Sequence, residues 1–261
     1  MLLNKLLIDL NHYQITGKDN IDITNIVYDS RKAQPNSLFI CIDGFEQDGH
    51  QFINNAINNG TVAVIIEKEL EEYRDNLTYV KVKDSRQAMS ILARTFYNYP
   101  LKKVTLIGVT GTNGKTTTTY LIKGIIDRAG FKSGLIGTIN VIIGEEKLPA
   151  TRTTPESLDL YRYYYKMVQK GIKYIVMEVS SHALDLKRVQ GMNFDIAVFT
   201  NISQDHLDYH NTIADYLKAK ARLFAQLKNE GFAIINIDDS RADKIMAASK
   251  GKVLTYGLKE E

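Results

Sequence analysis

The sequence predicts an α/β protein whose larger part is a mostly parallel sheet with helices on both faces. Three observations favour this class: near-continuous apolar segments such as 174–179 and 232–237, their alternation with helix-length segments, and a Gly-rich segment that joins an apolar strand to a helix. Ligands bind such sheets at the carboxyl ends of the strands. The residues that follow each strand are therefore the first candidates for a site.

The composition is that of an ordinary globular protein. The chain has 261 residues, 44% hydrophobic and 24% charged, which allows one or two domains. A net charge of +3 without a dense Lys/Arg block argues against nucleic acid as a partner. Cys41, the single cysteine, excludes an internal disulfide and is expected in the core. The first 14 residues read as an amphipathic helix, no run reaches transmembrane length, and a cytoplasmic protein without membrane insertion is expected.

The first hundred residues alternate short strands and helices. Strands are expected at 23–28, 38–42, 61–66 and 78–82, and helices at 51–58 and 85–98. Two polar segments follow strands, at 29–31 and 44–50, and each taken alone is more simply an ordinary turn. A short linker at 100–103 places the domain boundary between residues 102 and 103, which gives domains 1–102 and 103–261.

The second domain begins with a candidate phosphate-binding loop. Further strands are expected at 104–109, 133–138, 174–179, 196–200 and 232–237, with helices at 115–129, 155–170 and 213–228. Gly111, Thr112, Asn113 and Gly114 follow the first of these strands and precede Lys115 and Thr116. Glycines allow close backbone approach, a helix N-terminus faces the anion, the lysine adds a charge and the hydroxyl suits Mg²⁺.

This loop departs from the strict pattern G-x-x-x-x-G-K-[ST]. That pattern requires glycine at position 109, where the chain has Val109, and glycine stands instead at 108 and 111. The alternative is a Gly-rich turn without a ligand, but Gly-Lys-Thr between a strand and a helix favours phosphate binding.

Polar residues gather after two later strands. Glu178 closes the apolar segment 174–179, where a carboxylate is well placed to hold Mg²⁺, and the alternative is an ordinary charge at a strand end. The loop 201–210 contains two histidines and two aspartates, which suggests metal or phosphate chemistry or simply a solvated loop.

Lys220 lies on the apolar side of a predicted helix. On a helical wheel of 213–228, Ile213, Leu217, Phe224 and Leu227 form one stripe with Lys220 in its middle. Lys218 and Arg222 fall on the opposite face. An inward lysine has to extend to solvent, pair with an acid or be chemically altered, and periodicity alone leaves these options open.

The polar segment 151–156 precedes the tyrosine-rich helix. Thr153 or Thr154 reads as a helix N-cap with Pro155 at the first helical position, and such a loop can also touch a substrate.

Taken together, these segments resemble the Mur ligases, ATP-dependent enzymes that build the peptide of peptidoglycan. Four segments occur in the order of that family: TGTNGKTTT, MEVSSHAL, TNISQDHLDYH and YLKAKARLF. The combination of DSR, DGH, TRTTPE and SSHALDLKRV is similar to the MurE-type branch, which adds the third amino acid to UDP-N-acetylmuramoyl-dipeptide. The resemblance extends over essentially the whole chain.

The resemblance implies a uridine-diphosphate-binding N-terminal domain and a central ATPase domain with ATP and Mg²⁺. It implies ATP contacts from residues 111–117, namely Gly111, Thr112, Asn113, Gly114, Lys115, Thr116 and Thr117. The implied catalytic and metal-binding residues are Lys115, Thr116, Glu178, His206 and Lys220, the last as a carbamate. The implied substrate contacts are Ser30, Gly44, Phe45, Glu46, Gln47, Thr153, Thr154, Ser180 and Arg188.

The implied reaction is phosphoryl transfer from ATP to a carboxylate, followed by attack of an amino group on the acyl phosphate. The chain ends soon after the strand at 232–237, without the family's third domain, so we expect it to bind ligands and not to complete ligation alone. We also expect a monomer. The competing hypothesis is a P-loop regulatory module that ligates nothing. Which amino acid is added, diaminopimelate or lysine, is left open.

Overall fold

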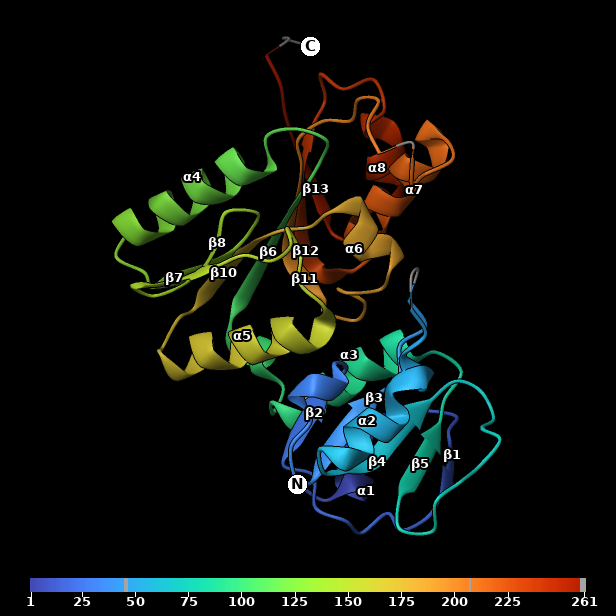
Figure 1. Cartoon of the computed structure of the whole chain (residues 1–261). Helices are drawn as coiled ribbons and strands as arrows, with labels where there is room; N and C mark the ends of the chain where they lie inside the picture. The colour runs from blue at the N-terminus through green and yellow to red at the C-terminus, as the bar shows by residue number, and fades with distance from the viewer. Residues whose placement is uncertain (45–46, 207, 259–261) are drawn as a thin grey trace. The chain divides into compact units, whose positions relative to one another are not determined.

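A computed structural model describes residues 1–44, 47–206 and 208–258 of the chain. The chain forms two compact units, Met1–Tyr99 and Pro100–Glu261, and each is described by itself (Figure 1). The boundary expected at 102/103 falls inside the 3₁₀ turn η3 (Pro100–Lys103), with which the second unit begins. Two of the expected substrate contacts, Phe45 and Glu46, lie outside the described residues.

The first unit is a five-stranded sheet in the order β1-β5-β4-β3-β2, in which β2 to β5 are parallel and β1 is antiparallel to β5. The parallel strands and the two longer helices confirm the expected segments, with ends that shift by two residues at most. The strands are β1 (Gln14–Thr16), β2 (Asn25–Val27), β3 (Ser37–Ile40), β4 (Thr61–Ile66) and β5 (Thr78–Lys81). The helices are α1 (Leu3–Leu6), η1 (Ser30–Lys32), η2 (Gly49–Phe52), α2 (Ile53–Asn58) and α3 (Ser85–Phe96).

The helix expected over the first 14 residues is wrong beyond its first turn. Helix α1 has four residues, and strand β1 begins at Gln14. His12 adopts a left-handed φ of 56°, a conformation that does not continue a helix. The leucines that suggested the helix are nevertheless core residues, because Leu3 and Leu6 are fully buried. Cys41 is also buried, as expected.

The second unit is an eight-stranded sheet in the order β13-β12-β11-β6-β10-β7-β8-β9. The six strands from β13 to β7 pair in parallel, which confirms the predicted mostly parallel sheet. The strands are β6 (Thr105–Thr110), β7 (Ser133–Ile136), β8 (Asn140–Ile143), β9 (Glu146–Pro149), β10 (Tyr174–Glu178), β11 (Phe194–Phe199), β12 (Leu227–Asn236) and β13 (Lys252–Tyr256). The helices are α4 (Lys115–Arg128), α5 (Ser157–Gln169), α6 (Ser181–Asp185), α7 (Ile213–Phe224) and α8 (Ala242–Ala248).

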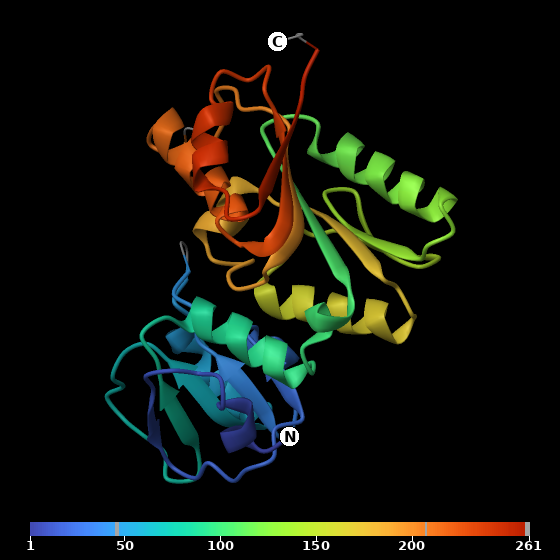
Figure 2. The same ribbon diagram turned by 180° about the vertical axis from the view of Figure 1, so that it is seen from behind.

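Helices cover both faces of this sheet. Helix α4 lies on one face, where its Ile122 and Ile126 pack against a core of Ile107, Val109, Val176 and Val198 (Figure 1). Helices α7 and α8 lie on the opposite face, as the view from behind also shows (Figure 2). Since Glu178 pairs in register with Val109, its side chain points to the same face as α4. This alternation brings Glu178 to the start of α4.

Two predictions for the second unit are wrong at their ends. The helix expected to reach residue 228 ends at Phe224, and Leu227 opens strand β12. Leu227 is buried as a strand residue at the position where a longer helix would also have buried it. The apolar stripe of the helical wheel therefore continued past the true end of the helix. The antiparallel hairpin of β8 and β9 was not expected, because β9 is polar and largely exposed.

Candidate functional site

The Gly-rich segment forms a tight loop between β6 and α4. Gly111 and Gly114 adopt φ values of 155° and 83°, which favour glycine. A side chain on Gly111 would also collide with the hydroxyl of Thr200. The loop conformation therefore depends on glycine at both positions.

The start of helix α4 is prepared for an anion. Gly114 is the N-cap, no side chain caps the helix, and its first turn has no acidic residue. The N–H groups of the first helical residues, Lys115 to Thr117, have no acceptor within the helix. Together with the helix dipole, these donors favour a phosphate group.

The residues that follow β11 are hydrogen-bonded to the phosphate loop. The sequence did not indicate this contact. The Asn201 carbonyl accepts from Thr112 N at 2.8 Å, and its Oδ1 accepts from Asn113 N at 3.0 Å. The hydroxyl of Thr200 donates to the carbonyl of Asn113 at 2.7 Å. Two amides of the loop are thus used for its own structure, which leaves the helix start as the donor of N–H groups.

The side chain of Lys115, the first residue of α4, folds back over the preceding loop. Its Nζ donates to the carbonyls of Gly111 and Thr112 at 2.9 and 2.8 Å. Burial lowers the pKa of Lys115, and the charge of Glu178 opposes that shift. The ammonium group is therefore near the helix start, where a phosphate would be held.

Glu178 is a fully buried carboxylate that faces the hydroxyl of Thr116. Its Oε2 accepts from Thr116 Oγ1 at 3.0 Å and from Thr138 Oγ1 at 3.0 Å, and its Oε1 accepts from Thr138 N at 2.9 Å. A buried carboxylate is costly without compensation. The structure thus brings together a hydroxyl and a carboxylate, the hard oxygen donors that suit Mg²⁺.

Lys220 points inward, as the helical wheel predicts. It is 1% exposed, whereas Lys218 and Arg222 are exposed. Its Nζ donates to the carbonyl of Gly111 at 2.7 Å and lies 4.2 Å from the centre of the Tyr216 ring. Burial, aided by the charge of Lys115, lowers the pKa of Lys220 to about 6. This amine is therefore largely neutral at pH 7.

His206 belongs to a cluster of aromatic rings beside this lysine. Its ring centre lies 5.0 Å from that of His182 and 6.0 Å from that of Tyr216. The side chain of His206 is 44% exposed. His210 packs on the same Tyr216 ring at 5.2 Å, and its Nε2 is buried without a partner among the described residues. Tyr216 thus connects His206 with Lys220.

The threonines before α5 do not cap that helix. The N-cap is Glu156, and the helix starts at Ser157, so the expected capping by Thr153 or Thr154 and the expected first position for Pro155 are wrong. Thr154 instead donates to the carbonyl of Glu178 at 2.9 Å and accepts from Ser180 N at 3.1 Å.

Thr153 and Arg188 belong to the same group of contacts. The hydroxyls of Thr153 and Thr138 lie 3.1 Å apart, within hydrogen-bond distance, and Arg188 donates to the carbonyl of Thr154 at 3.2 Å. The four expected contacts for the muramoyl-peptide, Thr153, Thr154, Ser180 and Arg188, therefore lie together beside Glu178.

In the first unit, Ser30 and Gly44 follow the parallel strands β2 and β3. Ser30 is buried in the 3₁₀ turn η1, where Asn59 donates to its carbonyl at 3.0 Å. Gly44 N donates to the carbonyl of Gln47 at 3.0 Å. Both residues lie at the carboxyl ends of strands, the edge where ligands bind such sheets.

Among the described residues, the candidate site offers few metal-binding side chains. Across residues 1–44, 47–206 and 208–258, no group of three or more His, Cys, Asp or Glu side chains is arranged to hold a metal ion. Thr116 and Glu178 supply two oxygen donors, a set that fits an Mg²⁺ ion shared with phosphate oxygens. In the same described ranges, no helix is both long and apolar enough to span a membrane.

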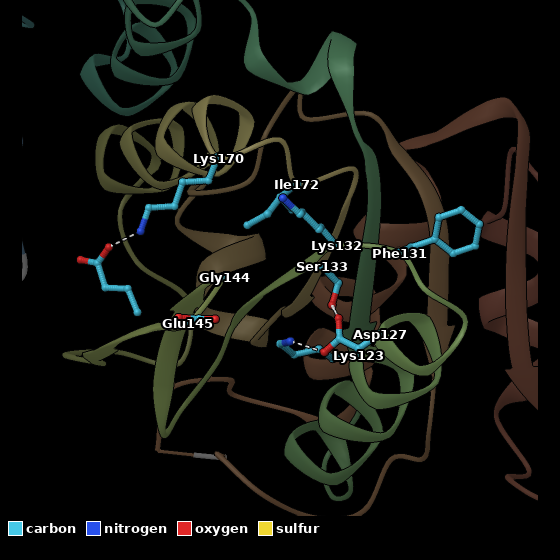
Figure 3. Close-up of a pocket in the computed structure, with 10 residues that line it drawn as sticks. Lys123, Asp127, Phe131, Lys132, Ser133, Gly144, Glu145, Lys170 and Ile172 are labelled. Carbon is cyan, nitrogen blue, oxygen red and sulfur yellow. Dashed lines mark hydrogen bonds and ion pairs between the residues drawn. The ribbon is translucent and has the colours of Figure 1, made fainter.

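A separate hollow of about 810 Å³ lies at the opposite edge of the sheet, beside the amino end of β7 (Figure 3). Four of its charged residues form two ion pairs: Lys123 with Asp127 at 2.5 Å, and Lys170 with Glu146 at 2.7 Å. None of the expected site residues lines it. This hollow is therefore distinct from the candidate site.

Curated proteins resemble the chain closely. A ligase of Caldanaerobacter subterraneus subsp. tengcongensis named UDP-N-acetylmuramoyl-L-alanyl-D-glutamate–2,6-diaminopimelate ligase is 51% identical over 248 residues, which is 95% of this chain and 51% of the relative. A protein of the same name from Oceanobacillus iheyensis is 48% identical over 269 residues, 100% of this chain and 54% of the relative. The chain thus spans about half the length of the curated relatives it matches.

Solved structures and family profiles agree with these relatives. A structure of a protein of the same name superposes with a TM-score of 0.82 at 30% identity and covers 100% of this chain and 53% of that one. The profile of the Mur ligase middle domain matches residues 109–261, and the profile described as Mur ligase family, catalytic domain, matches residues 22–97. The chain therefore belongs to the Mur ligase family.

Proposed function

We propose that this chain forms the ATP-binding and UDP-sugar-binding parts of a MurE-type ligase. The reaction joins an amino acid to the D-glutamyl end of UDP-N-acetylmuramoyl-L-alanyl-D-glutamate, in the cytoplasm, for peptidoglycan synthesis. The names of the relatives favour 2,6-diaminopimelate over lysine. The observation that carries this proposal is the buried Glu178 held against Thr116 and the start of α4.

In this proposal the ATP phosphates bind the helix start and Lys115. Thr116 and Glu178 would hold an Mg²⁺ ion, whose positive charge would offset that of the phosphates. Thr153, Thr154, Ser180 and Arg188 hold the peptide end of the substrate. Ser30 and the segment from Gly44 to Gln47 hold its uridine diphosphate end. Phosphoryl transfer to the substrate carboxylate needs charge neutralisation and positioning rather than a protein nucleophile.

Lys220 is proposed to react with carbon dioxide to form a carbamate, which with His206 holds a second Mg²⁺. The neutral amine is the form that attacks carbon dioxide, and the lowered pKa of Lys220 supports its presence at neutral pH. Peptide mass spectrometry of protein held in bicarbonate should find added carbon dioxide on Lys220 and none on Lys218. Unmodified Lys220 at saturating ATP and Mg²⁺ would contradict this role.

Calorimetric titration tests the proposed function with the 261-residue chain. Because the chain spans about half the length of its relatives, the experiment measures ligand binding rather than amide-bond formation. UDP-N-acetylmuramoyl-L-alanyl-D-glutamate should bind, and ATP with Mg²⁺ should bind independently. A P-loop regulatory module would bind ATP and ignore the UDP-sugar. The threonine and serine contacts around Glu178 favour the ligase, since a regulatory module has no need of them.

A further inference from the structure

The loop 200–203, which contacts the phosphate loop, is also bonded to the turn 237–241 that joins β12 to α8. In that turn, Asp239 accepts a hydrogen bond from the backbone N–H group of Ile202 at 2.7 Å. Arg241 donates to the backbone carbonyl of the same Ile202 at 3.1 Å. Ile202 is 4% exposed. Both backbone polar groups of this buried residue are therefore held by side chains of the turn.

The two neighbours of Ile202 carry contacts to the phosphate loop. Asn201 accepts from the N–H groups of Thr112 and Asn113, at 2.8 and 3.0 Å. The N–H group of Ser203 donates to the hydroxyl of Thr112 at 3.0 Å. Because the peptide bonds on both sides of Ile202 are planar and stiff, a displacement of Ile202 would displace both sets of contacts.

The carboxylate of Asp239 is itself fixed in orientation. Its second oxygen accepts from the N–H group of Arg241 at 2.9 Å, so each oxygen holds one backbone N–H group. Hydrogen bonds to an ionised carboxylate are stronger than those between neutral groups. The last residue of β12 adds a further contact, because the side-chain amide of Asn236 donates to the carbonyl of Thr200 at 2.8 Å.

We propose that Asp239, together with Arg241, is a positioning residue for ATP. It holds the loop 200–203 in place, and that loop keeps the phosphate loop in the conformation that presents the start of α4 to a phosphate group. The inference rests on the proposed binding of ATP. A site that adopts its binding conformation for only a fraction of the time loses affinity by that fraction. Loss of the Asp239 carboxylate should therefore weaken ATP binding without removing a group that contacts ATP.

A purely structural role for the turn is the competing explanation. Asp238 provides a matched control, because it is an aspartate of the same turn and is also half-buried. Its carboxylate accepts from the N–H group of Leu258 at 2.8 Å, beyond the end of β13. If the turn only stabilises the fold, removal of either carboxylate should have the same effect on ATP binding.

Calorimetric titration of ATP with Mg²⁺ into the 261-residue chain tests the proposal. Asp239→Ala should weaken binding by about tenfold, which corresponds to the loss of one charge-assisted hydrogen bond to the loop. Arg241→Met removes the second contact to Ile202 and should also weaken binding. Asp238→Ala should leave the affinity for ATP unchanged.

Amide hydrogen exchange without ATP gives a readout that a merely structural role would not move. In Asp239→Ala, exchange should become faster at residues 110–114, where the amides of Thr112 and Asn113 are bonded to Asn201. Exchange in strand β10 of the same unit should stay as in wild type. Asp239→Asn, which keeps one acceptor oxygen, should lie between the two. Asp238→Ala should match wild type at 110–114.

The outcomes separate the positioning role from the proposed function. A wild-type chain that does not bind ATP overturns the proposed function and the positioning role with it. If wild type binds ATP and Asp239→Ala binds it equally tightly, the positioning role alone is overturned. Equal losses in Asp238→Ala and Asp239→Ala, with unchanged exchange at 110–114, would assign the turn a structural role and also overturn it. Arg241→Met keeps the test decisive if Asp239→Ala does not fold.

Discussion

Lys115 and Lys220 donate to the same carbonyl oxygen, that of Gly111, at 2.9 and 2.7 Å. Two ammonium groups this close repel each other, and burial adds to the cost of charging the deeper one. The outcome is unequal: Lys220 has its pKa lowered to about 6, while Glu178 helps Lys115 to keep its proton. One lysine thus stays a cation for phosphate, and the other is an amine suited to chemical modification.

The lowered pKa of Lys220 makes stability depend on pH. Its pKa is about 6 in the folded chain against an ordinary 10.5, so the unfolded chain binds more protons between these values. The free energy of unfolding should therefore rise with pH in that window, by about 1.4 kcal/mol per pH unit for one proton. The stability gained in this way should disappear as the pH falls toward 6. Urea unfolding of Lys220→Met in bicarbonate-free buffer should show a flatter pH dependence than wild type. Lys218→Met, an exposed control, should match wild type, and parallel curves for all three proteins would contradict the assignment.

Lys115 is predicted to carry much of the affinity for ATP. Lys115→Ala removes the ammonium group at the helix start and should weaken ATP binding by at least about tenfold. Lys218→Ala, on the exposed face of α7, should leave ATP binding unchanged. Titration of ATP with Mg²⁺ into both variants measures the difference. Equal losses of affinity in the two variants would contradict the role of Lys115 in ATP binding.

At the scale of the element, the phosphate loop depends on its glycines. Gly111→Ala places a side chain at a φ of 155° and against Thr200, and should lower the free energy of unfolding by about 1–3 kcal/mol. Gly124→Ala is the control, because Gly124 lies inside α4 with open space around it. That change should raise stability by about 0.5–1 kcal/mol. Urea unfolding would contradict the argument if both changes had the same sign.

Much of the phosphate loop and of helix α7 could be predicted from sequence, because the signals for both are local. The order of strand, glycines, Lys115 and helix is continuous along the chain, and the period of α7 placed Lys220 inside. What sequence could not give are contacts across about 90 residues, such as Asn201 and Thr200 on the loop. The start of α5 was missed for a different reason: threonine is a better capping residue than glutamate, so the sequence favoured Thr153 or Thr154 over the Glu156 that occupies the N-cap.

At the scale of the whole molecule, the two units have separate sheets and should respond to different ligands. We predict that ATP with Mg²⁺ slows amide hydrogen exchange in the second unit, at the phosphate loop and around Glu178. UDP should slow exchange in the first unit, at the turns that follow β2 and β3. The reason is that bound groups stabilise the unit that binds them and leave local opening elsewhere unchanged.

Lys115→Ala provides the internal control for this experiment. It should remove the protection given by ATP in the second unit and leave the protection given by UDP in the first unit intact. Each unit then reports on its own ligand within one polypeptide, so a general loss of stability is distinguished from a loss of binding. Protection by UDP confined to the second unit would contradict the assignment of the uridine diphosphate contacts to Ser30 and the segment from Gly44 to Gln47.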